Sequence, residues 1–113
     1  MSIVDDRAEI AAALSTVDGV KGYEYPPRNA KPGDGWALLP TWELNGGLVW
    51  QAEWSVVVLL PADDRKASEW VDEHFDAIVT ALRVPGFPTN AQMSVMETEA
   101  GDRSVLEITM RSE

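Results

Sequence analysis

The chain has 113 residues, 45% hydrophobic and 25% charged, the composition of one ordinary globular domain rather than a disordered or fibrous protein. Nineteen acidic and nine basic side chains give a net charge of −10, which repels the phosphate backbone of nucleic acids and anionic membrane surfaces, so we expect no specific nucleic-acid binding and no membrane binding. The lack of cysteine excludes disulfides, thiolate zinc sites and cysteine nucleophiles, and no apolar run approaches the roughly 20 residues of a membrane span.

The first predicted element is a short amphipathic helix over residues 5–17, "DDRAEIAAALSTV", with apolar side chains every three or four positions. Its acidic first turn suits the positive end of the helix dipole. The start "MSIVDDRAEI" also lacks the cationic residues of a signal peptide, so we expect the chain to remain in the cytosol where it is made. Residues 20–25, "VKGYEY", alternate weakly and predict a short strand.

The next stretch, "EYPPRNAKPGDGW" at residues 24–36, holds three prolines, two glycines and two cations between aromatic residues. It predicts an extended Pro/Gly-rich loop over 25–36 within one domain spanning 1–113. The "PGDG" segment reads as a tight turn, because a phosphate-binding loop feeds a helix and this one feeds a strand.

Two predicted strands follow, over residues 36–44 and 48–60, each with apolar side chains at even positions. Pro40 cannot donate to a ladder, so we expect an edge or a bulge there. "NGG" at 45–47 predicts a three-residue hairpin loop. That loop would place Leu44 opposite Leu48, Trp42 opposite Trp50 and Leu38 opposite Trp54.

Residues 62–83, "ADDRKASEWVDEHFDAIVTALR", predict a long amphipathic helix, which "VPGFPTN" ends. Two further strands are expected in "AQMSVMETE" (91–99) and "SVLEITMRS" (104–112). The order α-β-β-β-α-β-β predicts an α+β fold. We expect a mainly antiparallel sheet of about four to five strands with two helices packed on one face.

No segment carries a catalytic pattern. The single histidine, His74, lacks the second histidine or cysteine of a zinc site and fits the rim of a solvated helix face. Glu69, Asp72, Glu73 and Asp76 lie three and four residues apart, but a charged helix face explains them without a metal. We therefore expect no enzyme activity, no cofactor and no metal.

Five tryptophans are a heavy aromatic load for this length. Trp50 and Trp54 are predicted to lie in the core. Trp36 and Trp42 lie nearer to loops, where aromatic side chains often anchor a partner surface.

The layout resembles the small tail terminator, or tail completion, proteins of long-tailed bacteriophages, especially those infecting actinobacteria. The residues that carry the resemblance are "LSTVDGV", "YPPRNAKPGDGW", a tryptophan-bearing hairpin ending in "VVVLLP", "ASEWVDEHFDAIVTAL" and a final "VLEITMRS". Together they span nearly the whole chain.

The resemblance implies an α+β subunit that assembles as a ring, typically a hexamer, on the head-proximal end of the tail tube. That ring ends tube polymerisation and offers the surface for joining the head, so the expected partners are other copies, the tail tube protein and a head-tail connector or neck protein. The expected location is the virion tail, after assembly in the host cytoplasm. In this interpretation the candidate subunit or partner contacts are Tyr25, Pro26, Pro27, Arg28, Lys31, Trp36 and Trp42.

Three alternatives remain from the sequence. The first is a head-closure or other neck-ring protein. The second is a small cytosolic adaptor that binds a protein or peptide through its tryptophan hairpin. The third is a small enzyme whose site is completed at a subunit interface.

Overall fold

The structure is a computed structural model that describes residues 3–38, 40–44, 50–98 and 101–112. Its elements in chain order are α1 (Ile3–Ser15), β1 (Lys21–Tyr23), β2 (Asp34–Ala37), β3 (Thr41–Leu44), β4 (Trp50–Leu59), α2 (Asp64–Leu82), β5 (Gly86–Thr98) and β6 (Gly101–Ser112).

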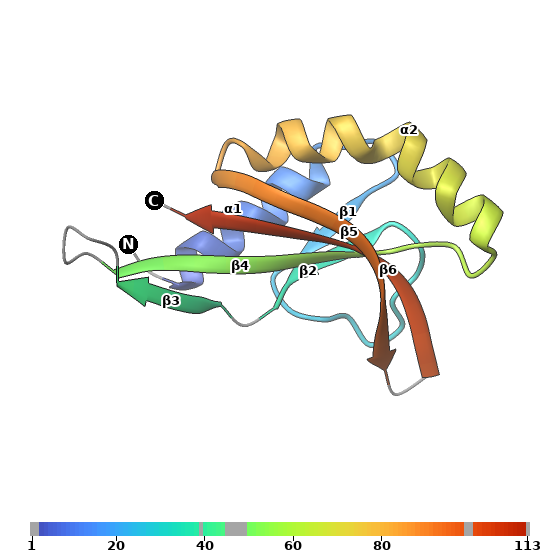
Figure 1. The fold of residues 1–113 in the computed structure, drawn as a ribbon, viewed down its shortest axis with the longest axis horizontal. Coiled ribbons are helices and arrows are strands. Elements are labelled where there is room, and N and C mark those ends of the chain that lie inside the picture. The colour runs from blue at the N-terminus through green and yellow to red at the C-terminus, as the bar shows by residue number, and fades with distance from the viewer. Residues whose placement is uncertain (1–2, 39, 45–49, 99–100, 113) are drawn as a thin grey trace.

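A six-stranded sheet forms the centre of the molecule, in the order β1-β2-β4-β6-β5, and β3 pairs with β4 beyond the end of β2. Only β1 and β2 run parallel, while the other pairings of the described strands are antiparallel. Both helices pack on one face of the sheet (Figure 1). The predicted α+β fold is confirmed, with six strands because residues 36–44 form two strands instead of one.

Helix α2 begins at Asp64, two residues after its predicted start at residue 62. The Asp63 carboxylate accepts hydrogen bonds from the backbone N–H groups of Arg65 (2.9 Å) and Lys66 (3.1 Å), which caps the first turn. The apolar stripe of the helix buries Ala67, Ile78 and Leu82 against the sheet. Within the described ranges, no helix is long and apolar enough to cross a membrane.

The main core lies between the helices and the sheet, and β4 supplies its centre. The even-numbered side chains from Ala52 to Leu60 are all buried, as their alternation predicts. From α1, Ile10 and Leu14 pack onto them. Each large aliphatic side chain buried in this way contributes about 1.5 to 3 kcal/mol, so this cluster is the main source of stability.

The strand predicted over residues 36–44 contains a bulge. β2 pairs Trp36 with Val57, whereas β3 pairs Trp42 with Ala52, so the segment between them holds one more residue than the facing part of β4. One extra residue moves later side chains to the other face, and Trp36 and Trp42 therefore lie on opposite faces. The expectation that all even-numbered side chains of residues 36–44 lie on one face was wrong. The expected irregularity at Pro40 is confirmed, because Pro40 lies in the segment that holds the extra residue.

The register of the β3–β4 hairpin also differs from the prediction. Leu44 pairs with Trp50 in the structure, and Leu38 donates its backbone N–H to the Ser55 carbonyl at 2.8 Å. The predicted loop over 45–47 lies outside the described residues. The predicted pairs that are wrong are Leu44 with Leu48, Trp42 with Trp50 and Leu38 with Trp54.

A second, smaller core lies on the face without helices. Its buried members are Trp36, Val57, Leu59 and Val105. The connection between β1 and β2 passes over this face (Figure 1), and Ala30 from that connection packs against the cluster. The Pro/Gly-rich segment therefore covers part of the sheet.

Strand β5 begins at Gly86, five residues before its predicted start at residue 91. "VPGFPTN" looked like a loop because it holds two prolines and a glycine. The pairing of β5 with β6 shifts between Pro88 and Asn90, which accommodates the proline at the outer edge of the sheet.

Candidate functional site

The loop between β1 and β2 is anchored at its C-terminal end. Gly33 donates its N–H to the Leu59 carbonyl (2.8 Å) and accepts from the N–H of Lys21 (3.0 Å), so it joins β1 to β4. The Asp34 carboxylate accepts from the backbone N–H of Lys31 at 2.9 Å. Gly33 has a φ of 96°, and a side chain there would run into the backbone carbonyl of Gly19.

The loop is also held by two arginines that come from other elements. From β6, Arg103 donates to the Ala30 carbonyl at 3.5 Å, the outer limit of a hydrogen bond. From α1, Arg7 donates through the same nitrogen to the carbonyls of Glu24 (3.1 Å) and Ala37 (2.6 Å). Arg7 therefore connects the beginning of the loop to the end of β2.

Arg7 is 6% exposed, which is unusual for a charged side chain. Its guanidinium carbon lies 5.0 Å from the ring centroid of Tyr25 and 5.3 Å from that of Trp54, distances at which a cation is attracted to an aromatic face. Sequence reasoning missed this residue because "DDRAEI" reads as the solvated first turn of a helix. The rings of Tyr25 and Trp54 lie far from it in sequence, so no local signal identifies the contact.

The structure separates the seven candidate contact residues by exposure. Tyr25, Pro26, Arg28, Lys31 and Trp42 are exposed, Pro27 is half-buried, and Trp36 is buried in the second core with 4% exposure. Within the described part of the chain, the side chains of Arg28 and Lys31 make no ion pair with any carboxylate. The cations thus face solvent, while Trp36 offers little surface to a partner.

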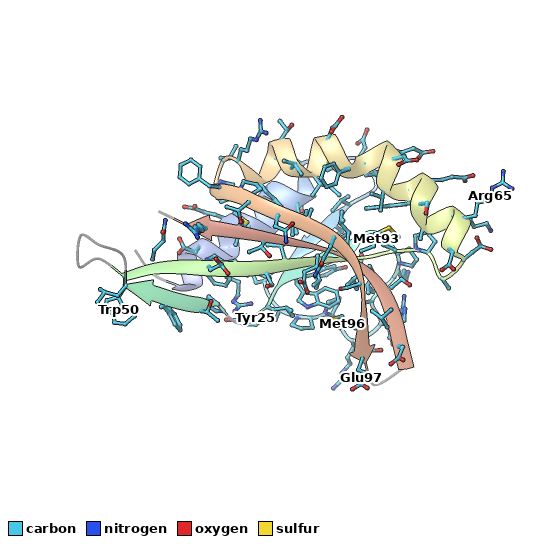
Figure 2. All side chains as sticks on the ribbon, in the orientation of Figure 1. Tyr25, Trp50, Arg65, Met93, Met96 and Glu97 are labelled. Carbon is cyan, nitrogen blue, oxygen red and sulfur yellow. The ribbon has the colours of Figure 1, made fainter. Side chains whose placement is uncertain are left out.

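Trp42, Leu44 and Trp50 form an exposed apolar surface at the end of the β3–β4 hairpin, which we call the hairpin patch. Their exposed fractions are 50%, 48% and 65%. They lie on the same face of the sheet as Ala52, because Trp42 pairs with Ala52 and Leu44 with Trp50. The prediction that Trp50 lies in the core was wrong. Figure 2 shows Trp50 at the far end of β4, away from the crossing of α2.

A second exposed apolar surface follows β5. Met93 and Val95 are 48% and 67% exposed, while Phe87, which is 54% exposed, pairs with Arg111 and lies on the opposite face. The sequence predicted a strand here but gave no reason to expect that its apolar side chains would remain uncovered. Met93 pairs with Leu106, which belongs to the main core, so Met93 and Val95 share the helix-bearing face with the hairpin patch.

The His74 side chain is held by contacts within the domain. Its ring stacks on Trp70 with 4.1 Å between centroids, and its Nδ1 lies 2.8 Å from the Trp70 carbonyl oxygen. The other nitrogen faces Gly19, where an added Cβ would lie 3.0 Å from Nε2. This placement at the rim of α2 is the one its sequence position predicted.

The described residues contain no group of three His, Asp or Glu side chains that could hold a metal ion. On α2, Asp72, Glu73 and Asp76 are exposed, and Glu69 pairs with Arg65 at 3.2 Å on the solvated surface. Such an exposed pair contributes little to stability.

One groove, of about 590 Å³, lies between the end of α1 and the second half of α2. Its charged lining residues are Asp18 and Asp76, which carry the same sign. A smaller one, about 190 Å³, lies between α2 and the start of β5. The first groove is also lined by Thr80 and by Thr16, whose hydroxyl donates to the Ala13 carbonyl at 2.7 Å, and the second has no charged residue among the described residues that line it.

No protein-family model matches this chain, and the search of curated proteins finds no relative. Its candidate function therefore depends on the surfaces described above and on the motifs quoted from its sequence.

Proposed function

We propose that this chain is a structural subunit of a bacteriophage tail, which forms a ring of six copies capping the head-proximal end of the tail tube. The ring stops tube polymerisation and provides the surface on which the head joins. The proposal originates in the resemblance to tail terminator proteins, whose expected partners are the tail tube protein and a neck protein.

The observation that carries the proposal is the hairpin patch. Two tryptophans and a leucine at about half exposure or more are costly to leave in water, and contiguous exposed apolar surfaces mark interaction sites. Aromatic side chains are enriched where proteins meet. A subunit that functions only within an assembly requires such a surface.

Charge supports the same function. A lining with the chain's net charge of −10 repels passing DNA, which suits a channel that DNA must cross without being retained. The exposed cations of the β1–β2 loop, Arg28 and Lys31, are available to acids of a neighbouring copy or of a tail or neck protein.

The proposal is tested by electron microscopy of particles assembled without this chain. We expect tails of uncontrolled length and heads that remain unattached. Tails of normal length joined to heads would rule the proposal out. Tails of normal length with unattached heads would instead indicate the head-closure or neck-ring function.

A second candidate, an adaptor that binds a protein through the hairpin patch, is favoured by the same exposed tryptophans. It predicts a stable monomer or dimer that does not associate with tail tubes. Co-sedimentation of the purified chain with tubes separates the two functions, because only the tail subunit is expected in the pellet.

A further inference from the structure

The sheet has open edges on its two opposite sides. In the described structure β5 pairs only with β6, and β3 pairs only with β4, so the outer edge of each carries unpaired backbone N–H and C=O groups. Exposed strand edges of this kind are templates for pairing with another chain. Proteins usually protect such an edge with lysine, proline or a bulge.

Strand β5 protects only its first half. Pro88 and the shift in pairing between Pro88 and Asn90 interrupt the edge near its start. From Asn90 to Met96 the strand has no proline and no charged residue. Met93 and Val95 in this segment are 48% and 67% exposed, so the part of the edge that lacks protection also carries exposed apolar side chains.

The Asn90–Met96 edge and the hairpin patch avoid charge in a strongly acidic chain, whereas β3 itself carries one acidic residue, Glu43. Residues 84–96 form a run of 13 uncharged residues, and residues 44–52, which include Trp50, form another of nine. Copies with a net charge of −10 repel each other, and the repulsion is weakest where neither surface carries charge. Depletion of charge is also the compositional mark of interface cores.

The directions of the two edges are compatible. β3 is antiparallel to β4, β4 to β6 and β6 to β5, so β3 and β5 run in opposite directions within one copy. A second copy placed with its β3 beside β5 of the first therefore makes an antiparallel ladder with both helix-bearing faces on the same side. The hairpin patch of one copy then meets Met93 and Val95 of the other on that shared face.

We infer that copies of this chain join head to tail, with the outer edge of β3 and the hairpin patch of one copy docked on the Asn90–Met96 edge of the next. The inference rests on the proposed ring, because a head-to-tail contact uses both edges and can close, whereas two identical edges make only a dimer.

The positions of the edges favour a closed assembly. β3 pairs with the first residues of β4. Figure 2 shows Trp50 at one end of the long axis of the molecule, with Met93 and Met96 far from it along that axis. Pairing these segments staggers successive copies along the strand direction. A stagger of this kind is what closes a sheet into a barrel-like ring.

The hairpin patch supplies only part of the area that a stable interface buries. With about 150 to 250 Å² per aromatic side chain, its exposed area is roughly 300 Å², less than half of the roughly 800 Å² that each partner buries in a standard interface. The backbone ladder and the β5 side chains supply further area. Both edges are therefore expected to be necessary.

The first test compares two lysine substitutions by sedimentation at increasing protein concentration. Val95→Lys places a charge on the proposed edge, and Val84→Lys places the same charge on the turn before β5, where the valine is 88% exposed. Each lysine lowers the net negative charge, so weaker association cannot come from greater overall repulsion. We expect association at least about tenfold weaker for Val95→Lys, and within about twofold of wild type for Val84→Lys.

Two results of this test overturn the inference. One is equal association of the two variants. The other is a wild-type chain that stays monomeric at millimolar concentration. This second result does not contradict the proposed function, because the tail tube itself can recruit single copies. Conversely, a chain that associates through both edges but leaves tail length unchanged contradicts the proposed function and not the edge contact.

The second test identifies which edges meet. The chain has no cysteine, so Ser94→Cys on β5 and Thr41→Cys on β3 each introduce a single thiol with little change in volume. Both side chains lie on the face without helices. With a short bifunctional thiol reagent, we expect a covalent dimer from the mixture of the two variants and little from either alone. A dimer that forms as readily from Ser94→Cys alone indicates edge pairing between identical strands and overturns the inference.

Discussion

Replacing Arg7 with methionine is expected to destabilise the fold more than replacing any other charged residue that the structure describes. Methionine keeps the apolar stem but removes the hydrogen bonds to the carbonyls of Glu24 and Ala37. Hydrogen bonds from a charged donor contribute about 1.5 to 3 kcal/mol each, and the contacts with the rings of Tyr25 and Trp54 add about 0.5 to 2 kcal/mol.

The net loss is smaller than this gross total. Removing a buried guanidinium also removes the cost of keeping its charge away from water. The Glu24 carbonyl is only part-buried and can bond to water, whereas the Ala37 carbonyl is buried and is left unpaired. We therefore expect Arg7→Met to lower the free energy of unfolding by about 2 to 4 kcal/mol.

The assay is urea unfolding followed by tryptophan fluorescence, with Arg65→Met as the matched control. Arg65 has a side chain that is 88% exposed in a surface ion pair, so its substitution is expected to cost under about 0.5 kcal/mol. Trypsin should also cut after Arg28 faster in the Arg7 variant, because the start of the loop is released. A loss under about 1 kcal/mol with unchanged cleavage would refute the argument that Arg7 holds the loop.

Three further predictions concern other parts of the fold. Gly33→Ala should cost at least about 2 kcal/mol, because its positive φ adds to a clash with backbone, whereas Gly101→Ala, with φ 106° and open space, should cost about 1 kcal/mol. Trp50→Ser should lower the free energy of unfolding by under about 1 kcal/mol while weakening assembly, since its ring is 65% exposed. Arg28→Glu combined with Lys31→Glu should leave stability within about 0.5 kcal/mol of wild type and reduce joining to tails.

Three results would contradict these predictions. Equal unfolding midpoints for the two glycine variants would show that the clash at Gly33 relaxes. Trp54, which is fully buried, is the reference for Trp50, and a comparable loss from Trp54→Ser and Trp50→Ser would show that the hairpin patch is covered within one copy. Normal tail joining by the doubly reversed variant would make the β1–β2 loop a structural cover with no role in binding.

The parts of the fold predicted from sequence are those where one periodic pattern acts alone. The alternation of β4 and the three-to-four spacing of α2 each indicate a single buried face, and the structure has those faces. The irregularity at Pro40 also follows from local chemistry, because proline cannot donate to a ladder.

The errors come from features that periodicity does not record. One inserted residue between β2 and β3 reverses the face of Trp36 without changing the even spacing of the apolar residues. Trp50 follows the same alternation as Trp54, yet it lies beyond the region that the helices cover. Alternation shows which face a side chain occupies, but what covers that face depends on the length and position of other elements.

The candidate site could be predicted only in part. Tyr25, Arg28 and Lys31 were singled out for their composition and are exposed, whereas Arg7, which anchors their loop, carries no local signal. The exposed edge of β5 was also missed, because a sequence shows that a strand is present and not that its outer edge lacks a neighbour.

The proposed function as a tail subunit is tested most directly by polymerising the candidate partner, a bacteriophage tail tube protein, with and without the purified chain, and imaging the tubes by electron microscopy. The account predicts that the chain shortens the tubes and forms a ring at one end only, and that Val95→Lys weakens both effects while Val84→Lys does not. Tubes of unchanged length with bare ends in the presence of the wild-type chain would contradict it.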